Sequence, residues 1–280
     1  MRKAAVAGQF YDADASRLKE NLKELLSQPK KSDFEADMTG MVVPHAGYVY
    51  SGKAAASAYN LIRDQKIDTF VIIGPNHSGL ENAISFENFE TSLGIAENDN
   101  EFGKELMKNS DLIKKDENAH KYEHCIEVQL PFLQFLFKKI KIVPVLVGSL
   151  NYEGCKKIAE AIEKTARKLK RKICVIASSD FTHYGKGYNF IPFSGTNEEI
   201  KKKLYDLDKK AISFIEKLHG KEFLDYSEKT TICGRFAITI AVEFAKLQKS
   251  KVKLIDYYTS GDVASDYRNA VGYASIVFYR

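Results

Sequence analysis

The sequence predicts an α/β protein: a single domain with a central mixed, largely parallel sheet flanked by helices. From Met38 onward, short runs rich in β-branched residues alternate with segments of helical periodicity. The 280 residues contain no Pro- or Ser-rich linker, internal repeat or low-complexity tract, so residues 1–280 are expected to form one domain. Apolar residues make up 44% of the chain and charged residues 28%, which suits a globular core and excludes disordered, collagenous and disulfide-dense classes.

The alternating pattern places each element in turn. The expected strands are residues 41–43, 69–73, 142–147, 173–177, 252–258 and 271–279. The expected helices are residues 53–63, 101–108, 123–137, 152–169, 198–218 and 235–247. Pro131 interrupts the third helix, because it removes a backbone donor and clashes with the carbonyl group of Glu127. That helix is therefore expected either to kink at Pro131 or to begin there.

The charge pattern argues against nucleic-acid and membrane partners. The chain has 42 Lys and Arg against 37 Asp and Glu, a net charge of +5, and its basic runs at 167–172 and 201–203 are typical of solvated helix faces. No apolar stretch approaches the ~18 residues of a membrane span. After Arg2 and Lys3 the apolar run is shorter than the roughly seven residues of a signal-peptide core, so a cytoplasmic location is expected.

Ionisable side chains follow several of the expected strands directly. His45 and His77 each come just after a strand, and Asp180 and His183 follow a third. Ligands of open α/β sheets bind beyond the carboxyl ends of the strands, so these side chains are expected around one site. His45 and His77 are candidate imidazole ligands for a metal ion. Asp180 is expected to pair with an imidazole or to bind a cation, because burying an unpaired carboxylate costs too much.

A second cluster of ionisable residues lies in the middle of the chain. His120, Glu123 and His124 fit the H-x-x-E-H pattern of one class of zinc metallopeptidase, in which two His bind zinc and the Glu activates water. No apolar helical stripe precedes His120, which weakens this interpretation. In the preferred alternative, His124 and Glu127 share one helical face and point into the cleft as acid/base or substrate-binding groups. The remaining alternative is a surface ion pair with Lys121.

The four cysteines are widely spaced, contain no C-x-x-C motif and do not form a disulfide pattern. Cys125, Cys155 and Cys174 lie in expected helices or strands and are interpreted as structural. Cys233 precedes an apolar helix and has Arg235 nearby, and both the helix dipole and the positive charge favour its thiolate. Cys233 is therefore interpreted as a metal ligand or a nucleophile, with a small apolar core residue as the alternative.

A series of motifs, taken together and in order, resembles the Memo family (mediator of ErbB-driven cell motility). The motifs are AGQFY at 7–11, VPHAGY at 43–48, GPNH at 74–77, EHCIE at 123–127 followed by Leu130-Pro131, PVLVG at 144–148, SSDFTHYG at 178–185 and TICGR at 231–235. YTSGDV at 258–263 and VGYA at 271–274 are similar to the prokaryotic branch of that family. The resemblance spans nearly the whole chain.

The resemblance implies a fold similar to that of the class III extradiol dioxygenases, which use non-haem iron(II), with a metal pocket at one end of the sheet. Carried over by position, it implies metal ligation by His45, His77 and Cys233. Where those dioxygenases have a carboxylate as the third ligand, this sequence has Cys233. A thiolate is softer than a carboxylate and suits copper, zinc or iron in other roles, which argues against ring cleavage. Iron(II) or copper is the expected cofactor, with zinc as the alternative.

The resemblance also implies roles and partners. Asp180 and His183 are expected to lie beside the ligands and to move protons or orient the ligands, and His124 to polarise the substrate. Family members have been linked to iron or copper binding and redox chemistry in animals and to phosphotyrosine-peptide binding. Bacterial and archaeal members often accompany radical-SAM proteins. A small-molecule or peptide ligand and association with a radical-SAM protein are therefore expected.

Three functions follow from these residues. The leading one is an oxidoreductase that acts through iron or copper. The second is a non-enzymatic module that binds a peptide or an anion, with Arg235 and the histidines as donors. The third is a metal-independent enzyme with Cys233 as nucleophile and a His as base.

Overall fold

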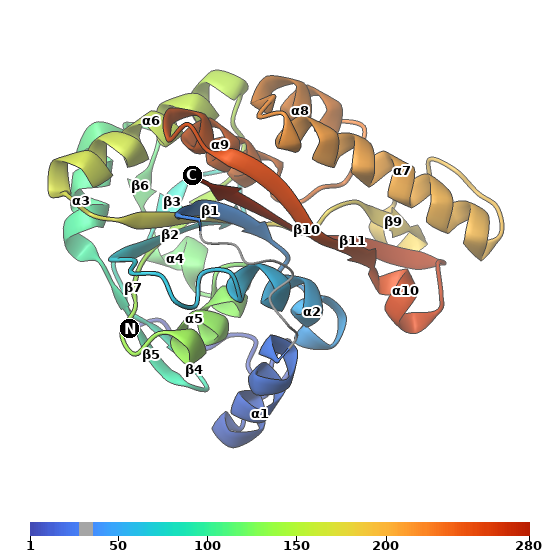
Figure 1. Ribbon diagram of the computed structural model, residues 1–280, viewed down its shortest axis with the longest axis horizontal. Coiled ribbons are helices and arrows are strands. Elements are labelled where there is room, and N and C mark those ends of the chain that lie inside the picture. Colours follow the sequence, from blue (N-terminus) through green and yellow to red (C-terminus); the bar gives the residue numbers. More distant parts are fainter. Residues whose placement is uncertain (28–35) are drawn as a thin grey trace.

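One large sheet organises the computed structural model, which describes residues 1–27 and 36–280 (Figure 1). Its strands run in the order β10 (Lys251–Thr259), β11 (Asn269–Tyr279), β1 (Met38–Val43), β8 (Ile173–Ser178), β2 (Thr69–Pro75), β7 (Lys141–Val147), β3 (Ala83–Ile84) and β6 (Lys114–Lys115). Neighbours among β1, β8, β2 and β7 are parallel, whereas β10, β11 and β1 pair antiparallel. The predicted mixed, largely parallel sheet is confirmed.

Three short strands extend this sheet. β5 (Gly94–Asn98) pairs parallel with β7 and antiparallel with β4 (Phe89–Thr91), and β9 (His183–Gly185) pairs antiparallel with β11. The central strands β1, β2 and β8 are buried along their whole length. A strand buried on both faces reads as a continuous apolar run, and this is why the sequence located these strands.

Helices cover both faces of the sheet, with a separate apolar core under each layer (Figure 1). One layer contains α3 (Asn100–Asn109), α6 (Tyr152–Leu169), α7 (Asn197–Glu216), α8 (Gly220–Ser227) and α9 (Arg235–Leu247). The other contains α1 (Ala15–Leu26), α2 (Tyr48–Tyr59) and α5 (Leu130–Leu136). The short helices α4 (Glu117–His120) and α10 (Ser260–Ala264) lie in connections.

The sequence analysis missed α1, although its signals are present. Asp14 caps the helix by accepting hydrogen bonds from the N–H groups of Ser16 and Arg17. Leu18, Leu22 and Leu26 are buried at i, i+4 and i+8, which is the spacing of one helical face.

The third expected helix is shorter than predicted. α5 begins at Leu130, with Pro131 in its first turn, where the missing N–H group costs nothing. A 3₁₀ turn, η1 (Glu127–Gln129), precedes it, and residues 123–126 are not helical. Of the two outcomes expected for Pro131, the helix begins there, and the segment before it is free to form an irregular loop at the carboxyl end of the sheet.

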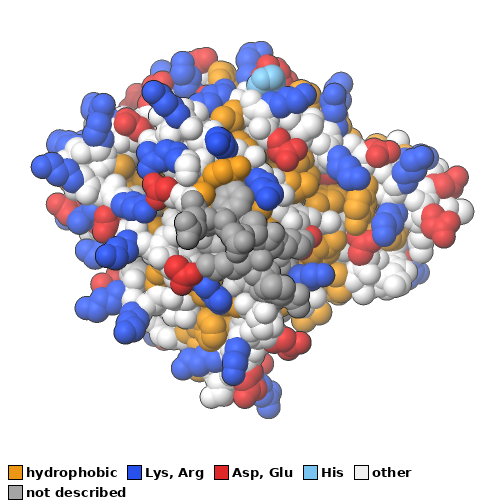
Figure 2. Space-filling view, in the orientation of Figure 1, with side chains coloured by type: hydrophobic (Ala, Val, Ile, Leu, Met, Phe, Trp, Pro, Cys, Tyr) orange, Lys and Arg blue, Asp and Glu red, His pale blue; other side chains and the backbone are white. Residues whose placement is uncertain are grey.

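The basic run at residues 167–172 forms surface ion pairs near the end of α6. Lys168 contacts Glu105 at 2.7 Å, and Arg171 contacts Glu101 at 2.7 Å. Figure 2 shows Lys and Arg spread over this face of the molecule with acidic side chains between them. Within the described residues, no helix combines the length and the apolar character that crossing a membrane requires.

A buried carboxyl group, Asp208 of α7, holds the loop that follows β8. It accepts hydrogen bonds from the N–H and hydroxyl groups of Thr182 and from the hydroxyl group of Tyr257, the last at 2.7 Å. Asp208 has no exposed surface. Burial raises the pKa of Asp208 to about 6, against the opposing effect of these hydrogen bonds.

Replacement of Asp208 by Asn is expected to remove a pH dependence of stability. Between the ordinary pKa of 3.8 and about 6, the folded protein holds a proton that the unfolded chain has lost, so the free energy of unfolding falls as pH rises. From about pH 4.5 to about pH 7, the wild type should lose about 2 kcal/mol relative to Asp208→Asn. Urea unfolding at both pH values measures this difference, and identical pH dependence of the two proteins would contradict the prediction.

Candidate metal centre

The site lies at the carboxyl ends of three neighbouring parallel strands. Because β8 lies between β1 and β2, the loops that follow these strands leave the sheet side by side. His45, His77 and Asp180 each lie two residues past the end of β1, β2 and β8, respectively. The strand order therefore brings these side chains to one edge of the sheet.

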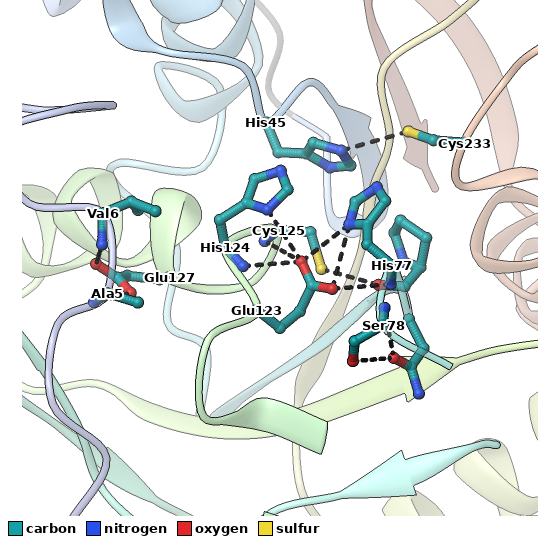
Figure 3. A network of polar contacts seen from close by, with 12 residues as sticks. Ala5, Val6, His45, His77, Ser78, Glu123, His124, Cys125, Glu127 and Cys233 are labelled. Atoms are coloured by element: carbon teal, nitrogen blue, oxygen red, sulfur yellow. Dashed lines mark hydrogen bonds and ion pairs between the residues drawn. The ribbon is translucent and has the colours of Figure 1, made fainter. Parts of the chain in front are cut away.

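Three of the expected ligands come together. His45, His77 and Cys233 each offer one donor atom, and these atoms all lie within 4.8 Å of one another. His45 Nε2 lies 3.3 Å from Cys233 Sγ, and the rings of His45 and His77 stand edge to face with centroids 5.5 Å apart (Figure 3). Bonds of about 2.0–2.3 Å to one ion allow donors up to about 4.6 Å apart. His45 Nε2 and Cys233 Sγ lie within this limit, and the 4.8 Å bound on the whole group is close to it, so the group has nearly the spacing that one transition-metal ion requires.

Hydrogen bonds around Ser178 decide which nitrogen of His45 carries the hydrogen. The Ser178 hydroxyl donates to the carbonyl oxygen of Cys125 at 2.6 Å and accepts from the side-chain amide of Gln129 at 2.8 Å. With its one hydrogen used, this hydroxyl accepts from His45 Nδ1, 3.0 Å away. The lone pair of His45 Nε2 then faces Cys233. Burial and the neighbouring histidines lower the pKa of His45 well below its usual range, so the ring stays neutral, the form that binds metal.

Cys233 reaches the site through a close approach of two backbone segments. It lies just before α9, and the N–H group of Gly234 donates to Ser179 Oγ at 2.9 Å. A Cβ atom at position 234 would lie 2.5 Å from Ser179 Cβ, so a side chain there would push Cys233 away from the end of β8. Glycine is therefore required at position 234 for the site to form.

The expectation that Cys233 is a thiolate is wrong for the metal-free protein. Burial, and then the charge of Asp180, raise the pKa of the Cys233 thiol. The guanidinium group of Arg235 lies over the ring of Phe236, 4.8 Å from its centroid. The Cys233 thiol is 3.3 Å from His45 Nε2 and donates to it, so a metal ion must displace this proton.

Glu123 is a site residue whose role the sequence analysis missed. Its carboxylate contacts Nδ1 of His77 at 3.0 Å and Nδ1 of His124 at 3.2 Å (Figure 3). Burial opposes ionisation, but the hydrogen bond from His77 and the backbone N–H of Cys125 outweigh it and lower the pKa of Glu123. Glu123 in turn raises the pKa of His77, against the effect of burial. His77, Glu123 and His124 also form a second group whose donor atoms lie within 4.8 Å of one another.

The metallopeptidase interpretation of the H-x-x-E-H pattern is wrong. His120 is buried, and its Nε2 atom lies 3.3 Å from the carbonyl oxygen of Ala83. Burial lowers the pKa of His120 to about 4. Among the described residues, His120 belongs to neither group of candidate metal donors. The two histidines of the pattern therefore face different surroundings, because α4 ends at His120 and the loop turns away before His124.

Glu127 ties the N-terminal segment to the site and does not point into the cleft. It is fully buried in an ion pair with Arg2. Its carboxylate also accepts hydrogen bonds from the N–H groups of Ala5 and Val6, at 2.8 and 3.1 Å, and from the hydroxyl group of Tyr11 at 2.6 Å. The expected role of Glu127 in substrate binding is therefore wrong, because residues 123–126 are not helical and the Glu127 carboxylate binds the N-terminal segment.

A cleft of about 420 Å³ lies beside the candidate ligands. The rings of Phe10, Tyr50 and Tyr188 and the polar side chains of His124 and Asp180 contribute to its walls. Phe10 packs against His124, with ring centroids 4.9 Å apart, so the segment held by Glu127 forms one wall. The three candidate ligands are not among the described residues that line the cleft, which meets them through Ala46, next to His45, and through His124.

The other two expected site residues, Asp180 and His183, also line this cleft. Asp180 accepts a hydrogen bond from the N–H of His45 at 2.8 Å, and burial raises its pKa, against the charge of His183. His183 Nδ1 lies 3.0 Å from the carbonyl oxygen of Thr231. Because a carbonyl oxygen only accepts, Nδ1 of His183 carries a hydrogen.

Comparison with known proteins decides the family. The family model described as "Memo-like protein" matches residues 2–277. This chain belongs to the Memo family. Curated "MEMO1 family proteins" of Archaeoglobus fulgidus, Thermoplasma volcanium and Thermococcus onnurineus are 40%, 39% and 37% identical to it over 282, 286 and 289 residues. Each of these alignments covers at least 99% of both chains. The resemblance of the sequence motifs to Memo is thereby confirmed.

In this Memo protein, Glu127→Gln is expected to lower the free energy of unfolding by about 3–5 kcal/mol, because Arg2 would become a buried cation without an anionic partner. Urea unfolding at neutral pH measures the loss. Arg2 is 4% exposed, so water compensates little. A loss below about 1 kcal/mol, the size of an ordinary surface change, would show that the N-terminal segment does not depend on this pair.

Proposed function

We propose that this Memo protein binds an iron or copper ion through His45, His77 and Cys233 and acts as an oxidoreductase on a small molecule held in the adjoining cleft. The observation that carries the proposal is the convergence of three donor atoms within 4.8 Å of one another beside that cleft. A group of two imidazoles and one thiol is rarely gathered at strand ends for packing alone, since two of the three side chains keep part of their surface exposed.

The donor set fits a transition-metal ion. His45 is held as a neutral ring with a free Nε2 lone pair, which is the ligand form of histidine. Cys233 supplies a soft sulfur donor, which suits Cu(I), iron or zinc better than it suits a hard cation. Iron or copper, when bound, supplies the one-electron redox chemistry that these side chains lack.

The chain's own residues bind and orient the substrate and handle protons. His183 lies at the cleft wall with Nδ1 bonded to the backbone, and in its neutral form its Nε2 atom can accept a proton from a bound hydroxyl group. Asp180, with its pKa raised by burial, can hold a proton and also fixes the backbone of His45 through a hydrogen bond of 2.8 Å. His124 lies between the cleft and the other two histidines and is placed to polarise the substrate.

The proposal places this chemistry in the cytoplasm. All four cysteines are free, and three of them are buried. A reducing compartment keeps such thiols free, and it keeps Cys233 available as a ligand.

A metal-independent thiol enzyme is the second candidate, because Cys233 and His45 are in hydrogen-bond contact at 3.3 Å, as a nucleophile and its base would be. The raised pKa of Cys233 opposes this alternative, since a protonated thiol is a weak nucleophile. The binding-module alternative loses its expected cation, since Arg235 is not among the described residues that line the cleft.

Anaerobic purification without added metal, followed by elemental analysis and electron paramagnetic resonance, tests the proposal. About one equivalent of iron or copper per chain is expected. Protein that stays metal-free even after incubation with Fe(II) or Cu(I) would contradict it. Alkylation of Cys233 by iodoacetamide that is fast near neutral pH and unchanged by chelators would support the thiol enzyme instead.

Cys233→Ser is expected to change metal selectivity far more than stability. The Kd for Cu(I) should rise on the order of 100-fold, because an alcohol oxygen is a poor ligand for a soft ion, and the Kd for Fe(II) should rise much less. Unfolding free energy should fall by only about 1 kcal/mol. Competition titrations with chromophoric chelators measure both affinities.

Cys155→Ser is the matched control, since Cys155 is buried on α6, away from the candidate donors. Its hydroxyl can bond within the helix, so both affinities should remain those of the wild type. If Cys233→Ser also binds copper and iron like the wild type, Cys233 is not a ligand.

A further inference from the structure

We propose that Glu123 is a positioning residue that sets the tautomer of His77 and His124, so that both rings turn an unprotonated Nε2 atom towards the space shared with His45. The consequence for metal binding rests on the function proposed above, whereas the tautomer is a property of the metal-free protein and is tested separately.

The carboxylate of Glu123 is fixed in place by backbone donors. Its Oε2 atom accepts from the N–H group of His77 at 2.9 Å. Its Oε1 atom accepts from the N–H groups of His124 and Cys125 at 2.8 and 3.0 Å. The side chain is 2% exposed, so water does not compete for these bonds. A carboxylate held by three N–H groups acts only as an acceptor.

Both imidazoles present Nδ1 to this acceptor. Nδ1 of His77 lies 3.0 Å from Glu123 Oε1, and Nδ1 of His124 lies 3.2 Å from the same atom. The contact of His77 is a hydrogen bond, whereas that of His124 is an ion-pair contact. In both, an unprotonated Nδ1 would place its lone pair against the carboxylate, so a hydrogen on Nδ1 is favoured, and in the neutral ring Nε2 then keeps its lone pair. Figure 3 shows the second ring nitrogen of each histidine on the side of His45, away from Glu123.

His45 has the same tautomer for an independent reason: its Nδ1–H group donates a hydrogen bond to the hydroxyl group of Ser178. The three rings surround one space, with centroids of His45 and His77 5.5 Å apart, His45 and His124 5.3 Å apart, and His77 and His124 4.8 Å apart. When all three rings are neutral, three lone pairs thus face this space before any ion arrives. His77 depends most on Glu123, since its side chain is 37% exposed and its ring is hydrogen-bonded to Glu123 through Nδ1.

Glu123 could instead act as a metal ligand, because its donor atoms lie within 4.8 Å of those of His77 and His124. The hydrogen bonds argue against this role. Its oxygens already receive three backbone N–H groups, and an ion between Glu123 and the two Nδ1 atoms would have to displace both imidazole hydrogens. The two roles make different predictions for Glu123→Gln.

The first test is ¹⁵N NMR of the imidazole groups in metal-free protein. In the wild type, His77 and His124 should both show the Nδ1–H tautomer. In Glu123→Gln the amide nitrogen can donate to Nδ1 of His77, so His77 should shift to the Nε2–H tautomer. Glu127→Gln is the matched control: Glu127 is equally buried in the same segment but contacts no imidazole, so it should lose stability and keep the wild-type tautomers.

The second test is titration with Co²⁺, followed by the thiolate-to-cobalt absorption band. Glu123→Gln should raise the Kd for Co²⁺ by about 10–100-fold, the usual effect of losing a carboxylate that orients a metal-binding histidine, and should keep the band. Glu127→Gln should change the Kd much less.

A wild-type spectrum with His77 in the Nε2–H tautomer would overturn the proposal even if no variant folds. The proposal would also be overturned if Glu123→Gln protein kept His77 in the Nδ1–H tautomer but lost Co²⁺ binding. That result would identify Glu123 as a ligand. If wild-type protein shows no thiolate-to-cobalt band, the proposed metal site is wrong, and the NMR result alone decides the role of Glu123.

Discussion

One hydroxyl group, that of Ser178, joins the parts of the chain that make the site. Ser178 is the last residue of β8. Its hydroxyl group accepts a hydrogen bond from the ring of His45, in the loop after β1, and is hydrogen-bonded to both Cys125 and Gln129 in the segment that leads into α5. Three hydrogen-bonding groups meet at this one oxygen atom, which thereby joins three stretches of chain. A buried polar group of this kind is stable only if every partner is in place, so it selects one arrangement of the three stretches.

The sequence predicts the part of the site whose residues directly follow a strand or precede a helix. His45, His77 and Asp180 could be predicted because each directly follows a buried strand, and strand ends gather ligands in α/β sheets. Cys233 was found from its place before an apolar helix. The protonation of Cys233 could not be predicted in this way. Burial beside Asp180, which is more than fifty positions away in the chain, raises the pKa of the thiol and outweighs the effect of the helix dipole.

The residues that support the ligands were harder to predict. Glu123 sits in a motif that has another meaning in helical proteins, and only the irregular loop before Pro131 turns it towards His77. Glu127 and Arg2 are separated by 125 positions, and nothing in either local sequence indicates that they pair. Such distant partners are fixed by the packing of layers, which periodicity and capping signals do not encode.

The pairing of Arg2 with Glu127 also has a consequence for how the protein is made. Residues 2–11 are synthesised before residues 120–129, which form the surface that they bind. The wall that Phe10 contributes to the cleft therefore depends on contacts between residues more than a hundred positions apart, and such contacts form slowly because they must first close a long loop of chain. Until then His45, already emerged, has neither Ser178 nor Cys233 beside it. The candidate donors His45, His77 and Cys233 can therefore come together only after residue 233 has been synthesised.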